Sequence, residues 1–118
     1  MATHSAEEPQ QWVHLNGKLA PKAEAHLSIY DHGFLYGDGA FEGIRAYNGN
    51  IFRLHDHLVR LYRSVKAMGF ELNIDLETLK SHVVETARAN KHSTGYIRLS
   101  VSRGVGLGLD PKHLKTEP

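Results

Sequence analysis

The chain has 118 residues, with 14 lysines and arginines against 13 aspartates and glutamates, so its formal net charge is +1. The charges are interspersed and no apolar run approaches the roughly 20 residues of a membrane span, so neither a nucleic acid nor a membrane is expected as a partner. Cysteine is absent, which excludes a disulfide scaffold and thiolate metal sites and is typical of a reducing, cytoplasmic location.

The chain is expected to consist of two segments. Residues 1–11 are polar and acidic, and we expect them to form a disordered leader. The remainder, 12–118, is expected to form one domain. It begins with a hairpin, because Asn16-Gly17 is a strong turn signal and separates predicted strands over 12–15 and 18–20.

A glycine-rich stretch and a second hairpin follow. The stretch 28–39 combines three glycines with several aromatic residues and is predicted to be an ordered loop, since surface linkers rarely carry so many aromatic side chains. Asn48-Gly49 then repeats the turn signal between a predicted strand over 40–47 and a return strand over 50–54.

Two helices and a strand complete the predicted elements. Apolar residues recur at spacings of three and four over 55–68, and Gly69 is a natural stop. A second helix is predicted from Asp75 to about residue 90. Strict alternation over 95–102 predicts a strand with one apolar and one polar face. This order predicts an α+β domain, with a mostly antiparallel sheet and two helices packed on it.

Two arginines are candidates for binding anions, and the residues alone leave two interpretations open for each. Arg60 is either a solvated arginine paired with Asp56, four residues earlier on the helix, or an anion clamp. Arg98 shares the polar face of its strand with Tyr96 and Ser100. That face is either merely solvated or suited to a substrate carboxylate.

Other patterns carry no chemistry. Glycines at 104, 106 and 108 lack the spacing of a dinucleotide-binding or phosphate-binding loop. His55 and His57 lie on different helix faces without a third ligand, so no metal site is predicted and the histidines are interpreted as scattered surface residues. No serine lies in a nucleophile elbow.

Three stretches together resemble one enzyme family: YDHGFLYGDGAFEGIRAY (30–47), LHDHLVRLYRS (54–64) and YIR (96–98). They closely resemble the N-terminal part of branched-chain amino-acid aminotransferases, which are class IV, fold-type IV enzymes that use pyridoxal 5′-phosphate (PLP). The resemblance covers nearly the whole chain. It implies the small domain of such an enzyme, an amino acid and a 2-oxo acid as substrates, and a homodimer or larger homo-oligomer.

The resemblance also implies roles for individual residues. It assigns the PLP phosphate to Arg60. It assigns the substrate pocket to seven positions, which are Tyr36, Phe41, Gly43, Tyr96, Arg98, Leu107 and Leu109. Within this set, Tyr96 and Arg98 meet substrate carboxylates, Phe41 and Gly43 form the wall beside the cofactor, and Tyr36 and Leu109 reach across a dimer interface into the neighbour's pocket.

A second implication concerns what the 118 residues lack. In the family, the Schiff-base lysine lies in a C-terminal domain, and none of the lysines here matches it: Lys18, Lys22, Lys66, Lys80, Lys91, Lys112 and Lys115. We therefore expect no catalytic residue in this chain, an incomplete small domain without its last strand, weak or no retention of PLP, and no activity in isolation.

The expected reaction of the full-length enzyme transfers the amino group of leucine, isoleucine or valine to 2-oxoglutarate. D-amino-acid transaminases, (R)-amine transaminases and aminodeoxychorismate lyases of the same fold are alternatives, although the first and last usually lack the Tyr-Ile-Arg triplet at 96–98. An alternative of another class is a non-enzymatic oligomerisation or anion-binding module. The coding sequence beyond Pro118 would separate an enzyme from such a module.

Overall fold

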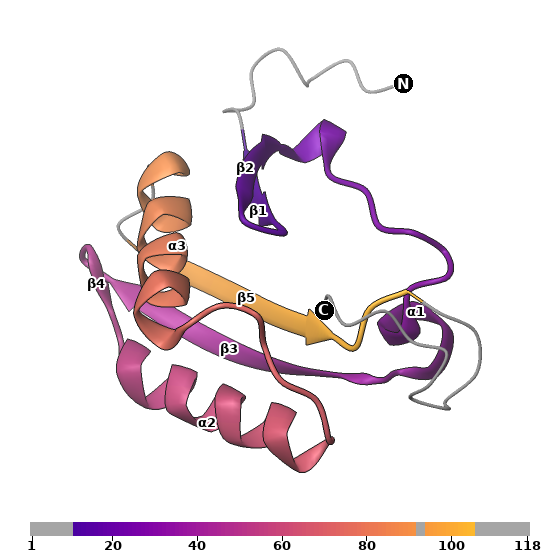
Figure 1. Ribbon diagram of the computed structural model, residues 1–118. Helices are drawn as coiled ribbons and strands as arrows, with labels where there is room; N and C mark the ends of the chain where they lie inside the picture. The colour runs from indigo at the N-terminus through magenta and orange to yellow at the C-terminus, as the bar shows by residue number, and fades with distance from the viewer. Residues whose placement is uncertain (1–10, 92–93, 106–118) are drawn as a thin grey trace.

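The computed structural model describes residues 11–91 and 94–105 (Figure 1). None of the helices in these two ranges is long and apolar enough to span a membrane. In chain order the elements are β1 (Trp12–Leu15), β2 (Lys18–Pro21), the short 3₁₀ helix η2 (Lys22–Glu24), α1 (His32–Tyr36), β3 (Gly39–Tyr47), β4 (Asn50–Ile51), α2 (Leu54–Ala67), α3 (Leu76–Ala89) and β5 (Gly95–Ser102).

The first hairpin forms a separate two-stranded sheet. β1 and β2 pair antiparallel, and Asn16 and Gly17 have φ of 50° and 90°, as a type I′ turn requires. The predicted hairpin is therefore confirmed. Asn90, at the end of α3, exchanges two hydrogen bonds with the backbone of Trp12 and so holds the hairpin against that helix. Of the expected leader, only Gln11 lies within the described residues, and its carbonyl accepts a hydrogen bond from Lys22.

The main sheet has three antiparallel strands in the order β4-β3-β5. Figure 1 shows β3 and β5 lying side by side across the molecule, and their register runs from Gly39 opposite Ser102 to Ala46 opposite Gly95. Gly39 is required at its end of the ladder, because a Cβ there would collide with the carbonyl of Val101. The antiparallel α+β architecture predicted from the sequence is confirmed.

The core lies between one face of this sheet and the helices α2 and α3. β3 contributes the fully buried Ile44, while α2 contributes Leu58 and Leu61 and α3 contributes Leu79 and Val83. These helical residues recur at spacings of three and four, so each helix presents one apolar stripe. The opposite face of the sheet is left uncovered by either helix and carries exposed aromatic and charged side chains.

Two boundaries differ from the predictions. The return strand expected over 50–54 ends at Ile51, because Arg53 adopts a left-handed conformation with φ of 52° and the helix begins at Leu54. The ordered loop expected over 28–39 contains the helix α1. Asp31 caps this helix by accepting a hydrogen bond from Gly33, and Gly37 ends it in the left-handed conformation. One turn is too short to give a periodic apolar signal.

We predict that truncating the core residue Leu58 to alanine lowers the free energy of unfolding by about 2–5 kcal/mol, because the side chain is fully buried and its removal leaves a cavity. Urea titration followed by circular dichroism measures the change. Lys66→Ala, on the exposed side of the same helix, is the control and should change the free energy by less than about 0.5 kcal/mol. Equal effects of the two substitutions would contradict the described core.

Candidate functional site

The uncovered face of the sheet brings together the predicted substrate residues of β3 and β5. Phe41 lies opposite Ser100 and Gly43 lies opposite Arg98, so these side chains share one face with Tyr96. The Arg98 guanidinium lies over the Phe41 ring at 3.9 Å from its centroid, and its Nε donates a hydrogen bond to Ser100 Oγ at 3.2 Å. The predicted grouping of Tyr96, Arg98 and Ser100 on one face is confirmed.

Gly43 makes room for the tyrosine of this face. A Cβ at position 43 would collide with the ring and the hydroxyl of Tyr96, so the ring lies directly over the glycine backbone. Phe41 and Tyr96 are 55% and 61% exposed. The face therefore offers one guanidinium, several hydroxyls and two aromatic surfaces to a molecule that approaches the sheet from the side away from the helices.

A buried carboxylate anchors Arg60. Glu42, on the core face of β3, is 4% exposed and receives the Arg60 fork, with Nη2 donating to Oε1 at 2.7 Å and Nε donating to Oε2 at 2.9 Å. His57 Nδ1 lies 2.7 Å from Oε1 and donates, because a carboxylate only accepts. The Arg60 side chain is nevertheless 68% exposed, and in the described part of the chain its Nη1 has no hydrogen-bond partner.

The ion pair keeps Glu42 charged. The hydrogen bond from Arg60 lowers the pKa of the Glu42 carboxyl below its ordinary value of 4.5, against the opposing effect of burial and with further help from His57. The same pair raises the pKa of Arg60. Arg60 is thus a permanent cation, held from behind and open to solvent on its outer edge. This arrangement can bind a phosphate or a carboxylate.

Two interpretations of single residues are wrong. Asp56 is not the partner of Arg60, since its carboxylate lies 3.9 Å from Arg53 Nε instead. His57 is not a simple surface histidine, because it is bonded to Glu42. The alternation along β3 carried a usable signal: position 42 falls on the same face as Ile44, and an acid on a core face needs partners from the helix that covers it.

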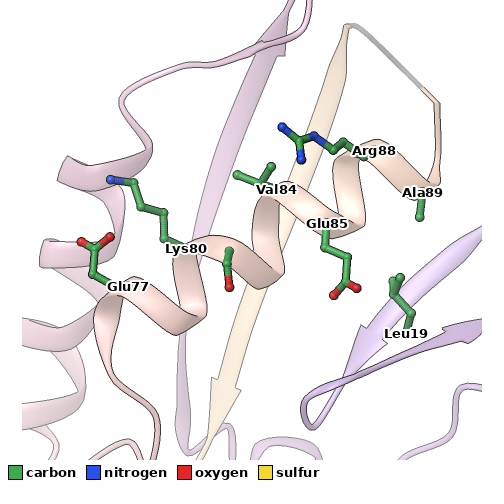
Figure 2. A pocket seen from close by; sticks show the side chains of 8 residues that line it. Leu19, Glu77, Lys80, Val84, Glu85, Arg88 and Ala89 are labelled. Atoms are coloured by element: carbon green, nitrogen blue, oxygen red, sulfur yellow. The ribbon is translucent and has the colours of Figure 1, made fainter.

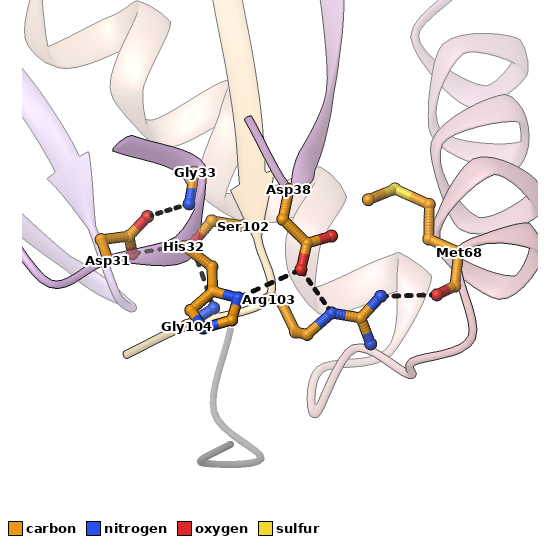
Figure 3. Close-up of polar contacts among 8 residues, drawn as sticks. All are labelled: Asp31, His32, Gly33, Asp38, Met68, Ser102, Arg103 and Gly104. Atoms are coloured by element: carbon orange, nitrogen blue, oxygen red, sulfur yellow. Dashed lines mark hydrogen bonds and ion pairs between the residues drawn. The ribbon is translucent and has the colours of Figure 1, made fainter. Parts of the chain in front are cut away.

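A second polar cluster lies where α1, β3, α2 and β5 meet (Figure 3). Arg103 Nε donates to Asp38 Oδ2 at 2.6 Å and its Nη2 donates to the carbonyl of Met68 at 2.6 Å. His32 Nδ1 lies 3.3 Å from the same Asp38 oxygen. Burial raises the pKa of Asp38, but the hydrogen bonds from Arg103 and His32 outweigh it and hold the pKa below 3.8. No sequence pattern predicted this cluster.

One predicted pocket residue, Tyr36, lies apart from the sheet face. Tyr36, the last residue of α1, is 47% exposed and meets the buried His32 ring edge-on at a centroid distance of 4.9 Å. Leu107 and Leu109 lie outside the described residues. In the ranges that the structure describes, no group of three histidine, aspartate or glutamate side chains is arranged to hold a metal ion.

An open groove lies apart from the described residues of both polar clusters and of the sheet face. It has a volume of about 670 Å³ and lies between α3 and the first hairpin (Figure 2). Leu19 of β2 and Val84 of α3 supply apolar surface, while Glu77, Lys80 and Arg88 supply charges of both signs. Of the residues assigned to cofactor or substrate, none that the structure describes lines this groove.

Comparison with known proteins shows which family the chain belongs to. Residues 39–116 match the family model of class IV amino-transferases, and the chain belongs to this family. It is 50% identical over 101 residues to a protein of Methanocaldococcus jannaschii described as "Putative branched-chain-amino-acid aminotransferase", covering 85% of this chain and 35% of the relative. It is 37% identical over 107 residues to the D-alanine aminotransferase of Bacillus licheniformis, covering 85% of this chain and 38% of the relative.

Solved structures show the same fold. A branched-chain amino acid aminotransferase in complex with N-(5′-phosphopyridoxyl)-L-glutamate superposes with a TM-score of 0.81 at 33% identity, over 93% of this chain and 38% of that chain. The enzyme of Thermoproteus uzoniensis with norvaline gives 0.78 at 40% identity, over 90% and 38%. The predicted small domain of a fold-type IV aminotransferase is confirmed. The chain spans little more than a third of the length of these proteins.

We predict a pH-dependent contribution of the Glu42 pair to stability. Because the pKa of Glu42 is lowered in the folded chain, the pair stabilises fully above about pH 4.5 and this contribution is lost as the pH falls further. The free energy of unfolding is measured by urea titration at pH 7 and at pH 3.5. The decrease in this free energy between the two pH values should be larger for the wild-type chain than for Glu42→Gln. Glu77→Gln, on the exposed first turn of α3, is the control, and its free energy of unfolding should fall by as much as that of the wild type. A loss in Glu42→Gln equal to that of the wild type would refute the pair.

Proposed function

We propose that the chain is the N-terminal part of a PLP-dependent branched-chain amino-acid aminotransferase, which transfers the amino group of leucine, isoleucine or valine to 2-oxoglutarate. The observation that carries the proposal is that β3 supports two anion-binding arginines, one for a cofactor phosphate and one for a substrate carboxylate. Its core face anchors Arg60 through Glu42, and its open face carries Phe41 beside Arg98. The relative of 50% identity and the complexes of the structural neighbours support the same assignment.

The residues present fit the phosphate of PLP. Structural neighbours have been solved with a phosphopyridoxyl group and with pyridoxamine 5′-phosphate. In this chain, Arg60 would hold the phosphate by its exposed edge, and the buried Glu42 prevents the guanidinium from swinging away. When bound, PLP supplies a ring that accepts electrons from the substrate Cα. The negative charge of Glu42 offsets part of the attraction, so tight binding needs further donors from the rest of the enzyme.

Arg98 and its neighbours would bind the substrate. Stacking on Phe41 and the hydrogen bond from Nε to Ser100 hold the guanidinium flat against the sheet. Its Nη groups are then available for a carboxylate, which binds a planar fork in two-point fashion. Phe41 and Tyr96 offer apolar surface to a branched side chain, and Tyr96 adds a hydroxyl. The chain therefore binds and orients the substrate.

The proposal includes inactivity of the isolated chain and a homodimeric enzyme. Proton transfer at the substrate Cα and covalent attachment of the cofactor both require a lysine, and none of the seven lysines here matches the family position. The segment before and within α1 exposes large apolar side chains, with Leu27, Ile29 and Phe34 at 66%, 66% and 71% exposed. Such a surface favours association with a second copy or with the rest of the enzyme.

A D-amino-acid transaminase is the second candidate. The D-alanine aminotransferases of Bacillus licheniformis and Staphylococcus aureus are each 37% identical to this chain. The triplet Tyr96-Ile97-Arg98 favours the branched-chain assignment, because it places an arginine on the open face of β5. Transamination of (R)-amines and lyase chemistry on the same fold remain outcomes of the substrate assay.

We predict that the full-length enzyme transfers the amino group of L-leucine, L-isoleucine or L-valine to 2-oxoglutarate with a kcat/KM at least about ten-fold above that for D-alanine. Glutamate formation measured with each donor tests this. The 118-residue chain assayed in parallel with added PLP should form no glutamate, and borohydride should fix no pyridoxyl group on it by intact mass. Preference for D-alanine would replace the assignment with the second candidate, and turnover by the short chain would disprove its inactivity.

We also predict that Arg60→Gln weakens PLP binding by the full-length enzyme roughly ten-fold or more, because a charge-assisted hydrogen bond to the phosphate is lost. Binding of pyridoxal, which lacks the phosphate, should be unchanged. Arg63→Gln, on the exposed surface of the same helix, is the matched control and should bind both compounds like the wild type. If Arg60→Gln retained wild-type affinity for PLP, the phosphate role of Arg60 would be wrong.

A further inference from the structure

The cluster of His32, Asp38 and Arg103 connects the elements that carry the proposed substrate residues (Figure 3). Asp38 immediately precedes β3, Arg103 immediately follows β5, and Met68 follows α2. One guanidinium bonds both Asp38 and the Met68 carbonyl and lies over the Phe70 ring at 4.8 Å from its centroid. The Arg103 and Asp38 side chains are only 17% and 12% exposed, so water weakens these contacts little.

The same pair lies at the end of the β3–β5 ladder. Asp38 and Arg103 flank the terminal pair of Gly39 and Ser102, and Arg103 N–H donates to the Asp38 carbonyl at 3.1 Å. A slip of one residue in strand pairing would move every side chain to the other face. A side-chain ion pair and a backbone bond at this end therefore help to keep Arg98 on the open face.

The helix α1 is attached to the same place. His32 N–H donates to the Gly104 carbonyl at 2.8 Å, and Ser102 Oγ donates to Asp31 Oδ2 at 2.7 Å. The His32 ring then fills the space between Asp38, on one side, and the Tyr36 ring, on the other. The Tyr36 ring thus packs against an imidazole that is itself placed beside Asp38.

Stability alone does not account for these residue types. His32 is completely buried, and its Nε2 has no hydrogen-bond partner among the described residues. A buried polar atom without a partner costs free energy that an apolar ring of similar shape would avoid. Partly buried ion pairs such as Asp38–Arg103 likewise add little net stability, and a role in fixing one geometry would account for them.

We infer that His32, Asp38 and Arg103 are positioning residues for the substrate side of the site, holding Tyr36 and the open face of β5 in one arrangement. The inference rests on the proposed function. It separates two properties, because the Arg60 guanidinium is held by Glu42, which also binds His57, and within the described residues makes no hydrogen bond or ion pair with this cluster. Disturbing the cluster should therefore weaken use of the substrate and leave the affinity for PLP unchanged.

The test uses the full-length enzyme with Arg103→Lys, Asp38→Asn and His32→Phe. Lysine keeps the charge of Arg103 but has no planar fork to bond two acceptors in different directions. We expect KM for the preferred amino acid to rise roughly ten-fold or more, with kcat within about three-fold and the PLP dissociation constant within about two-fold of the wild type. Arg63→Lys is the control and should leave all three constants unchanged.

A double variant distinguishes one connected cluster from separate structural effects. If the cluster acts as a unit, His32→Phe combined with Arg103→Lys should raise KM by clearly less than the product of the single effects. Circular dichroism and cooperative unfolding identify variants that are folded, and Asp38→Asn, the smallest change in shape, keeps the test valid if Arg103→Lys does not fold.

Wild-type KM in the folded variants would overturn the inference. A rise in KM accompanied by an equal loss of PLP affinity would also overturn it, because it would indicate general loosening of the structure. Failure of the proposed function would be recognised separately, because the wild-type enzyme would then transfer no amino group.

Discussion

The structure depends on a carboxylate that is buried on the core face of its central strand. Glu42 shares that face with Ile44, and a charge removed from water there is tolerable only with partners of opposite charge and good geometry. α2 supplies both partners, His57 and Arg60, from positions three residues apart. The rotation of α2 about its axis is therefore constrained by the pairing as well as by its apolar stripe, and the outer edge of Arg60 is left at the surface.

The two-residue period of a β-strand places the Glu42–Arg60 pair and the Phe41–Arg98 pair on opposite faces of the sheet. Alternate residues of β3 face the helices and the open side, so Glu42 and its neighbour Phe41 point in opposite directions. A cofactor phosphate held by Arg60 and a substrate carboxylate held by Arg98 would thus be placed by adjacent residues of one strand. Adjacent residues of one strand move little relative to each other, which would suit a reaction in which the two molecules must be held at a fixed distance.

Local signals predicted most of the elements, and long-range partners were not predictable from them. Asn16-Gly17, the helix stripe over 55–68 and the alternation of β5 all act within a few residues, and the corresponding elements are present. The partner of Arg60 lies 18 residues away and that of Arg103 lies 65 residues away. Helical spacing favours a near partner such as Asp56, whereas the observed partner is set by which face of β3 the helix covers. The single turn of α1 leaves no periodic signal.

The two arginine clusters make contact at different points along α2. Glu42 is paired with Arg60, near the middle of the helix. Arg103 donates a hydrogen bond to the carbonyl of Met68, just beyond the end of the helix. Because Arg103 reaches only the residue beyond the end of the helix, Arg60 in the body of α2 keeps its own attachment to Glu42. Under the proposed function, these attachments would support the binding surfaces of the site, and proton transfer at the substrate Cα would be left to a lysine.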